Sequence, residues 1–307
     1  MSNIIETKNL TKKFGKFTAV DKVSLNVDEG EIYGFLGLNG AGKTTTIRML
    51  LGMIAPTDGT AHILGKPIVR GKPGPWEQVG HIVEIPYAYP DLTVRENLVI
   101  FSRLRGLSKT NAVDRTIDQL KLTPYTAVKA GHLSSGNAQR LGLAKALIHN
   151  PRILILDEPS NGLDPAGIVE IRELLSDLSE NRKTTIFISS HILAEISKIA
   201  DRIGIIHNGK LIEELNAAQL EQRINKQLNI QTRNNELAMK ILIEEGLSPV
   251  MNNNGELSLT DTNSLDHPDD IAALLVSKSV PPLSLYMHEE DLEDYFLRII
   301  HANEVSP

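Results

Sequence analysis

One stretch near the N-terminus restricts what this chain can fold into more than any other feature. It reads Gly37, Leu38, Asn39, Gly40, Ala41, Gly42, Lys43 and Thr44, with Thr45 after it, and it fits G-x-x-x-x-G-K-[ST]. An apolar segment precedes it and a segment with helical spacing follows it. Glycines let backbone N–H groups turn around phosphate oxygens, and a helix start adds positive charge. We therefore expect residues 37–45 to bind nucleotide phosphates, with Lys43 reaching the β- and γ-phosphates and the Thr44 hydroxyl binding Mg²⁺.

A second motif joins an apolar strand to two carboxylates. Residues 153–156 are all Ile or Leu, and Asp157 and Glu158 follow them. Ligands of open α/β sheets bind at the carboxyl ends of the strands. This placement predicts that Asp157 holds Mg²⁺ and that Glu158 is the general base for the attacking water. The alternative is a strand ending in a solvated acidic turn, and the phosphate loop makes it much less favoured.

Strands and helices alternate up to about residue 210, which is typical of a mostly parallel sheet covered by helices. Beyond residue 210 the alternation weakens and the charge changes, because residues 211–307 hold 6 basic and 17 acidic side chains. We predict an α/β domain at 1–210, a linker at 211–225 and a small, acidic α+β domain at 226–307. The expected strands lie at 4–10, 17–27, 31–36, 79–85, 152–156 and 184–189, and the expected helices at 43–51, 92–105, 111–120, 137–149, 166–178 and 192–200.

Three further motifs follow in a fixed order. They are Leu133-Ser134-Ser135-Gly136-Asn137 before Ala138-Gln139-Arg140, then Asn161-Gly162-Leu163-Asp164, then Ser189-Ser190-His191. They resemble the signature LSGGQ, the D-loop and the switch histidine of ABC ATPases. The signature departs from the family pattern at Ser135 and Asn137. With the phosphate loop and the acidic strand end, the resemblance covers about two-thirds of the chain.

The resemblance implies a P-loop ABC ATPase fold, in which an antiparallel β subdomain and a helical subdomain accompany the parallel sheet. It implies that ATP and Mg²⁺ are bound between two cassettes, as a homodimer or with a second ATPase subunit. Ser134 and Gly136 would contact the γ-phosphate across the interface, Asp164 would tie the two half-sites together, and His191 would orient Glu158. Phe14 would stack on adenine, although a role in the core is the alternative for Phe14 and for Phe17.

Glu84 stands where the family usually places the Q-loop glutamine. A carboxylate keeps an oxygen ligand for Mg²⁺ and adds a charge, so Glu84 is a candidate metal ligand and catalytic residue. The alternative is an exposed loop acid. Residues 84–98 and 161–168 resemble the bacitracin and lantibiotic resistance ATPases, which implies resistance or immunity to peptide antibiotics.

An ATPase subunit of this kind implies a separate ABC-2 type permease, which would hold it on the cytoplasmic face of the membrane. Its contacts are expected between residue 85 and Arg105, at Tyr87, Tyr89, Leu92 and Phe101. Residues 291–297 resemble a C-terminal segment of such exporters' ATPases, and the acidic domain is expected to pack on the ATPase domain or assist pairing.

Composition excludes several other classes. The chain has no cysteine, no apolar run of membrane-spanning length and no apolar segment typical of a signal peptide, and its nine histidines lack paired metal-ligand spacing. One phosphate loop and no inserted coiled coil disfavour a soluble ABC protein acting on DNA or ribosomes, so no nucleic-acid partner is expected. Two alternatives remain open: an exporter of another drug, lipid or polysaccharide, and a slowly hydrolysing regulatory module, which Lys43, Asp157, Glu158 and His191 disfavour.

Overall fold

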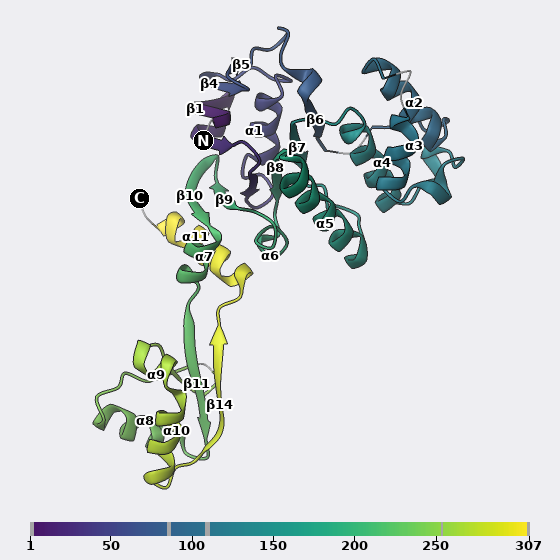
Figure 1. The fold of residues 1–307 in the computed structure, drawn as a ribbon. Helices are drawn as coiled ribbons and strands as arrows, with labels where there is room; N and C mark the ends of the chain where they lie inside the picture. The colour runs from purple at the N-terminus through teal and green to yellow at the C-terminus, as the bar shows by residue number, and fades with distance from the viewer. Residues whose placement is uncertain (1–2, 85–86, 108–110, 253, 306–307) are drawn as a thin grey trace. The chain divides into compact units, whose positions relative to one another are not determined.

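The fold was obtained as a computed structural model that describes residues 3–84, 87–107, 111–252 and 254–305 (Figure 1). The chain divides into two compact units, residues 1–218 and 219–307. Each unit is described by itself.

A six-stranded sheet forms the centre of the first unit, in the order β10-β9-β3-β8-β7-β6. The pairs among β9, β3, β8, β7 and β6 are parallel, and β10 runs antiparallel to β9. Every residue of β3, β7 and β8 is buried, as expected of strands covered on both faces. The strands are β3 (Ile32–Leu36), β6 (Val79–Ile82), β7 (Ile153–Asp157), β8 (Thr185–Ser190), β9 (Arg202–His207) and β10 (Lys210–Asn216).

A four-stranded antiparallel sheet lies beside the first helix, in the order β2-β1-β4-β5. Its strands are β1 (Asn3–Phe14), β2 (Phe17–Asp28), β4 (Asp58–Ile63) and β5 (Lys66–Pro67). The helix α1 (Lys43–Leu50) packs between the two sheets, where Ile47 and Leu50 join one core with Ile5 of β1 and Phe187 of β8. This packing fixes α1 and the loop that precedes it.

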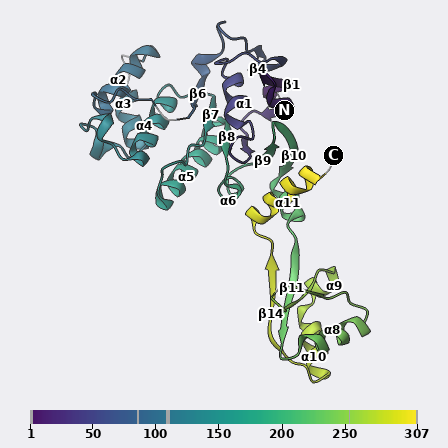
Figure 2. The ribbon, with the colours of Figure 1, turned by 180° about the vertical axis from the view of Figure 1, so that it is seen from behind.

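The remaining helices of the first unit form two groups. A helical group of α2 (Val94–Leu104), α3 (Ala112–Gln119) and α4 (Ser135–Leu147) packs together, and α4 also contacts β6 (Figures 1 and 2). The helix α5 (Pro165–Arg182) packs on β8, and α6 (Leu193–Ile196) follows that strand. Short 3₁₀ turns lie at Trp76–Gln78, Thr123–Tyr125 and Ala130–His132. The helix α7 (Ala217–Arg223) crosses the boundary between the units.

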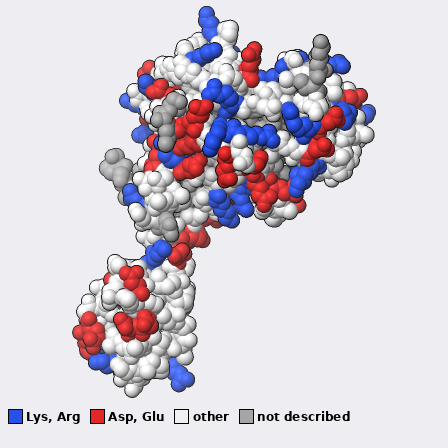
Figure 3. Space-filling view, viewed as in Figure 1, with Lys and Arg blue, Asp and Glu red and all other residues white. Residues whose placement is uncertain are grey.

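The second unit is a βαββαβ fold with an antiparallel sheet in the order β12-β13-β11-β14, the ferredoxin-like connectivity. Leu228 and Ile230 of the central strand pack with Leu242 and Leu275 of two helices. On the face drawn in Figure 3, acidic side chains outnumber basic ones on this unit, whereas both signs are intermixed on the first. Its elements are β11 (Lys226–Thr232), α8 (Asn235–Glu244), β12 (Val250–Met251), β13 (Leu257–Leu259), α9 (Thr262–Asp266), α10 (Pro268–Ser277), β14 (Pro282–Glu289) and α11 (Leu292–Val305).

Two expectations about the chain's organisation differ from this fold, and the strand β4 was not anticipated. The linker predicted at 211–225 is instead the edge strand β10 and the helix α7, and the first unit ends at 218 rather than 210. The helix predicted at 192–200 is only the four residues of α6. The strand β4 was not predicted from the sequence, because its Asp-Gly start is typical of a turn and its pairing with β1 comes from tertiary contacts.

Candidate ATP-binding and catalytic site

Residues 37–42 form a tight loop between the buried strand β3 and the start of α1. Gly40 and Gly42 have φ angles of 82° and 112°, which glycine adopts readily. A Cβ at Gly42 would lie 2.6 Å from the carbonyl oxygen of Ala19, and one at Gly37 would lie 2.5 Å from that of Ile206. The packing of the loop therefore requires glycine at both positions, and at Gly42 the positive φ requires it as well.

Lys43, the first residue of α1, has its ammonium inside this loop. Its Nζ donates to the carbonyl oxygens of Gly37 at 2.6 Å and Leu38 at 3.3 Å, and it lies 3.1 Å from Oε1 of Glu158. The Lys43 side chain is 6% exposed. These contacts hold a nearly buried positive charge between the phosphate loop and the end of β7.

Asp157 accepts two hydrogen bonds at the end of β7. Thr44 Oγ1 donates to its Oδ2 at 2.8 Å, and Ser189 Oγ donates to its Oδ1 at 2.7 Å. Asp157 is 2% exposed. The carboxylate and the Thr44 hydroxyl thus form a pair of oxygen donors, which is the ligand chemistry that Mg²⁺ prefers. Ser189 was not predicted as a site residue. It is identified by the pairing of β7 with β8, which sets Ser189 opposite Asp157.

Glu158 follows with φ of 49°, an uncommon conformation for a residue other than glycine. The turn directs its carboxylate toward two cationic or titratable groups: Oε1 faces Lys43, and Oε2 lies 2.8 Å from Nδ1 of His191. The Ser189 hydroxyl also accepts from the Glu158 backbone N–H at 3.1 Å. The structure therefore brings together Lys43, Glu158 and His191, three residues from separate motifs.

Glu84 is also positioned by a contact with α1. Its carboxylate forms an ion pair with Arg48, and its side chain is 58% exposed. It lines a cavity of about 530 Å³ together with Thr44, Asp157, Glu158 and Ser135. Glu84 is thus an exposed acid that lies beside the metal-ligand candidates, and its role as a metal ligand stays a prediction.

A second cavity, of about 320 Å³, adjoins the phosphate loop. It is lined by Phe14, Phe17, Ala19, Leu38, Asn39, Gly40, Gly42, Lys43, Thr44, Thr45 and Glu158. Phe14 and Phe17 are 52% and 63% exposed, so neither has the core role considered above. Both offer exposed aromatic surface beside the loop. Ala41, by contrast, is buried and supports the loop from inside.

The signature and D-loop residues contact each other within the chain. Ser134 is the N-cap of α4 and accepts from the Asn137 N–H at 3.3 Å, and Ser135 Oγ donates to the Gly162 carbonyl oxygen at 3.0 Å. Gly136 packs near Leu163. Asp164 is the N-cap of α5, where its Oδ1 accepts from the Gly167 N–H at 3.0 Å. Ser134, Gly136 and Asp164 line neither of the two cavities.

The described residues include no helix of the length and apolar character that crossing a bilayer requires.

Comparisons with known proteins show which family and fold the chain shares. A family model described as ABC transporter matches residues 20–161. The chain is 44% identical to the bacitracin transport ATP-binding protein BcrA of Bacillus licheniformis, over 99% of this chain and all of that protein. It is 35% identical to the lantibiotic transport ATP-binding protein SrtF of Streptococcus pyogenes, over 75% of this chain and all of that protein.

A solved structure has the same fold. It is the dimeric ATP-binding cassette MJ0796 in a post-hydrolysis state, bound to ADP and Pi. Its TM-score is 0.62 at 25% identity, and the match covers 69% of this chain and 98% of that one. ABC cassettes hydrolyse ATP, and they work as dimers with membrane permease partners. The chain therefore belongs to the ABC transporter family, as one of its ATP-hydrolysing subunits.

Proposed function

We propose that this chain powers an exporter of envelope-active peptide antibiotics, similar to bacitracin or the lantibiotics, and so gives resistance or immunity to them. The observation that carries the proposal is the extent of the similarity to BcrA, 44% over 99% of the chain. That similarity includes the second unit, which lies outside the residues matched by the family model. A likeness confined to the shared cassette would not favour any one cargo.

In the proposed ATP complex, the phosphate loop donates its backbone N–H groups to the β- and γ-phosphates. The Lys43 ammonium already lies inside the loop. On ATP binding it gives up its contacts with the loop carbonyl oxygens and with Glu158 and binds the phosphate oxygens instead. Phe14 stacks on the adenine ring from the rim of the same cavity. Thr45 and the residues of 37–42 complete the phosphate site.

Thr44 and Asp157 fit Mg²⁺ as direct oxygen ligands, and bound Mg²⁺ would neutralise charge on the transferred phosphoryl group. Ser189 fixes the Asp157 carboxylate through its 2.7 Å hydrogen bond. Glu84 would join this site through its free lone pairs, while Arg48 holds the carboxylate at the cavity.

Glu158 acts as the general base in the proposed hydrolysis. The water oxygen attacks the γ-phosphorus, the bond to the β–γ bridging oxygen breaks, ADP leaves with the electron pair, and Glu158 takes the water proton. His191 supports this step by holding one carboxylate oxygen, so that the other points into the site.

We infer that two copies, or this chain and a second ATPase subunit, close around two ATP molecules. Ser134 and Gly136 at the start of α4 would then present helix N-terminal N–H groups to the partner's ATP. Asp164 would contact the partner near its phosphate loop. This placement explains why these residues line neither cavity of a single chain.

The proposed membrane partner is a separate ABC-2 type permease, which would keep this chain on the cytoplasmic face of the cell membrane. Tyr87 and Tyr89 are 68% and 41% exposed, as expected of contact residues. Phe101 lies on α2, and Leu92 lies just before its start. Residues 85 and 86, where the predicted contact segment begins, lie outside the described residues.

The test is the antibiotic sensitivity of a strain lacking this protein, complemented with the wild-type chain or with Glu158→Gln. The panel contains bacitracin, several lantibiotics and chemically unrelated drugs. We expect only the wild type to restore resistance, and only to the peptides. Resistance restored to a non-peptide drug alone would contradict the peptide cargo and favour the alternative of another exported drug, lipid or polysaccharide.

A further inference from the structure

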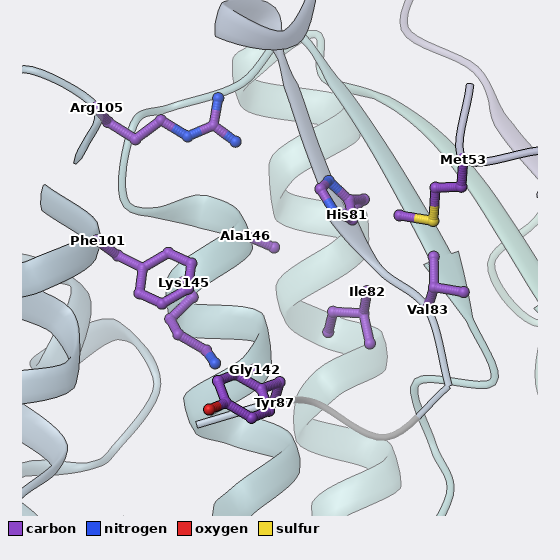
Figure 4. A pocket seen from close by; sticks show the side chains of 10 residues that line it. All are labelled: Met53, His81, Ile82, Val83, Tyr87, Phe101, Arg105, Gly142, Lys145 and Ala146. Atoms are coloured by element: carbon purple, nitrogen blue, oxygen red, sulfur yellow. The ribbon is translucent and has the colours of Figure 1, made fainter. Parts of the chain in front are cut away.

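A pocket of about 210 Å³ lies between the helical group and β6, apart from the two cavities of the nucleotide site (Figure 4). Its walls come from α2, β6 and α4, through Phe101, His81 and Lys145, and from Tyr87 and Arg105. Neither nucleotide binding nor hydrolysis uses any of these side chains. The volume is too small for a nucleotide and suits one side chain of another protein.

Lys145 is the feature of this pocket that most needs a partner. It is 8% exposed, and its Nζ lies 4.8 Å from the centre of the Phe101 ring (Figure 4). Among the residues that the structure describes, no carboxylate forms an ion pair with it. Burial lowers the pKa of the Lys145 ammonium to about 8. A largely buried cation without a counter-charge is costly to the fold, and a cation–π contact offsets only part of that cost.

The other titratable groups of the pocket do not supply the missing charge. Arg105 is a second cation, and it donates to the carbonyl oxygens of Trp76 and Val79. Burial lowers the pKa of His81. Burial also lowers the pKa of His149, which is near Arg105 but does not line the pocket, to about 4, so both rings are neutral at pH 7. Glu77 is the acid that stabilises the charge of Arg105. The pocket as a whole therefore favours an anionic ligand.

The rim of the pocket indicates what carries that anion. Tyr87 is 68% exposed and Met53 is 42% exposed, and Phe101 forms an apolar wall. A free inorganic anion prefers a site with several polar donors, whereas here one unpaired ammonium lies within aromatic and aliphatic surface. A carboxylate side chain flanked by apolar residues, as on an amphipathic protein segment, matches both features.

We propose that this pocket binds a glutamate or aspartate side chain of the permease, with Lys145 as its ion-pair partner. The identity of the partner protein rests on the proposed function, because the Tyr87 to Phe101 segment is where we place the permease. The chemistry of the ligand rests on the pocket alone. Lys145 thus acts as a specificity residue, since a permease segment with a neutral or basic residue there leaves the ammonium without a counter-charge.

The first test uses peptides and the isolated full-length chain, and it does not depend on a permease. The ¹³Cε resonance of Lys145 is followed while acetyl-Phe-Glu-Leu-amide or acetyl-Phe-Gln-Leu-amide is added. We expect only the glutamate peptide to shift the resonance and to raise the pKa of Lys145 above about 8. Equal responses to the two peptides, or no response to either, would overturn the proposal.

The second test compares Lys145→Met and Lys145→Glu with the exposed control Lys72→Met, in complexes purified with the permease from membranes. Lys145→Met should fold and bind ATP like the wild type, because methionine fills the buried site without a charge. We expect it to weaken permease association at least tenfold, and we expect a permease acid-to-lysine change to restore binding to Lys145→Glu. Wild-type association of Lys145→Met would overturn the proposal.

The two tests separate failure of this inference from failure of the proposed function. If the glutamate peptide binds but the wild-type chain retains no permease, carboxylate binding by the pocket is supported and the proposed exporter function is contradicted. If the wild type retains a permease and Lys145→Met retains it equally, the exporter function is supported and Lys145 does not contact the permease.

Discussion

Nδ1 of His191 lies 2.8 Å from Oε2 of Glu158, whose other carboxylate oxygen faces Lys43 at 3.1 Å. We propose that His191 orients the base and does not itself take the proton. We expect His191→Ala to lower ATP turnover about 10²-fold or more, within the range for a positioned acid–base group, and to leave ATP affinity within about threefold. Steady-state turnover and equilibrium ATP binding check this. Equal losses in both quantities would indicate a binding role instead.

Glu158→Gln should bind ATP and lose hydrolysis about 10²- to 10⁴-fold, because the base is removed while the phosphate contacts remain. Two ATP-bound copies are then expected to stay paired, since the paired state is no longer dissolved by hydrolysis. Size-exclusion chromatography with ATP and Mg²⁺ detects the pair. Unchanged turnover would exclude Glu158 as the base, and Glu180→Gln, at an exposed position of α5, serves as a control that keeps the base.

Lys43→Ala should weaken ATP affinity at least tenfold, because the ammonium inside the phosphate loop is lost. The variant also leaves Oε1 of Glu158 without its partner, so turnover should fall further than binding. Fluorescent ATP binding measures the first effect. Lys16→Ala, at an exposed position in the turn after β1, is the matched control, and equal affinity of the two variants would remove Lys43 from the phosphate site.

Glu84→Gln should change the Mg²⁺ dependence of turnover severalfold and change the free energy of unfolding by less than about 1 kcal/mol, because its ion pair with Arg48 is exposed. Arg48→Met should have a similar effect if the pair positions Glu84. Turnover is measured across a Mg²⁺ titration. A profile identical to that of the wild type would leave Glu84 as an exposed acid outside the metal site.

Because the pKa of His149 is lowered in the folded protein, we expect the protein to lose stability in acid. Burial, and to a lesser extent the neighbouring Arg105, lowers this pKa from 6.5 to about 4. The unfolded chain therefore binds more protons between pH 6.5 and 4, so stability falls as the pH falls through that window. Because the residue is partly exposed, we expect His149 to account for about 1–2 kcal/mol of this loss. Chemical unfolding of the wild type and His149→Gln between pH 7 and 4 measures it, and parallel curves would contradict the assignment.

The parts of the site that the sequence predicts are those set by local chain geometry. The phosphate loop needs glycines at fixed positions between a strand and a helix, and the acidic strand end follows four buried residues. Ser189 could not be predicted in this way, because its hydrogen bond to Asp157 depends on the pairing of β7 with β8. The Arg48–Glu84 pair joins residues 36 positions apart and has no sequence pattern.

The second unit was predicted only as a small α+β domain, for a physical reason. Its strands β12 and β13 have two and three residues, too few to show an alternating pattern. Its core is recognisable only after Leu228 and Ile230 have been brought against Leu242 and Leu275. Likewise, α7 and β10 occupy the predicted linker because pairing with β9, rather than local propensity, sets β10.

The helix α4 begins directly after Ser134 and carries Lys145 eleven residues later, about 16 Å along one continuous helix. Its first turn serves the proposed contact with a partner's ATP, and its last turn serves the proposed contact with the permease. Where the binding of ATP and the binding of the permease are coupled through this helix, the coupling free energy is the same in both directions. If ATP raises the affinity of this subunit for its permease by some factor, the permease raises the affinity of the paired subunits for ATP by the same factor.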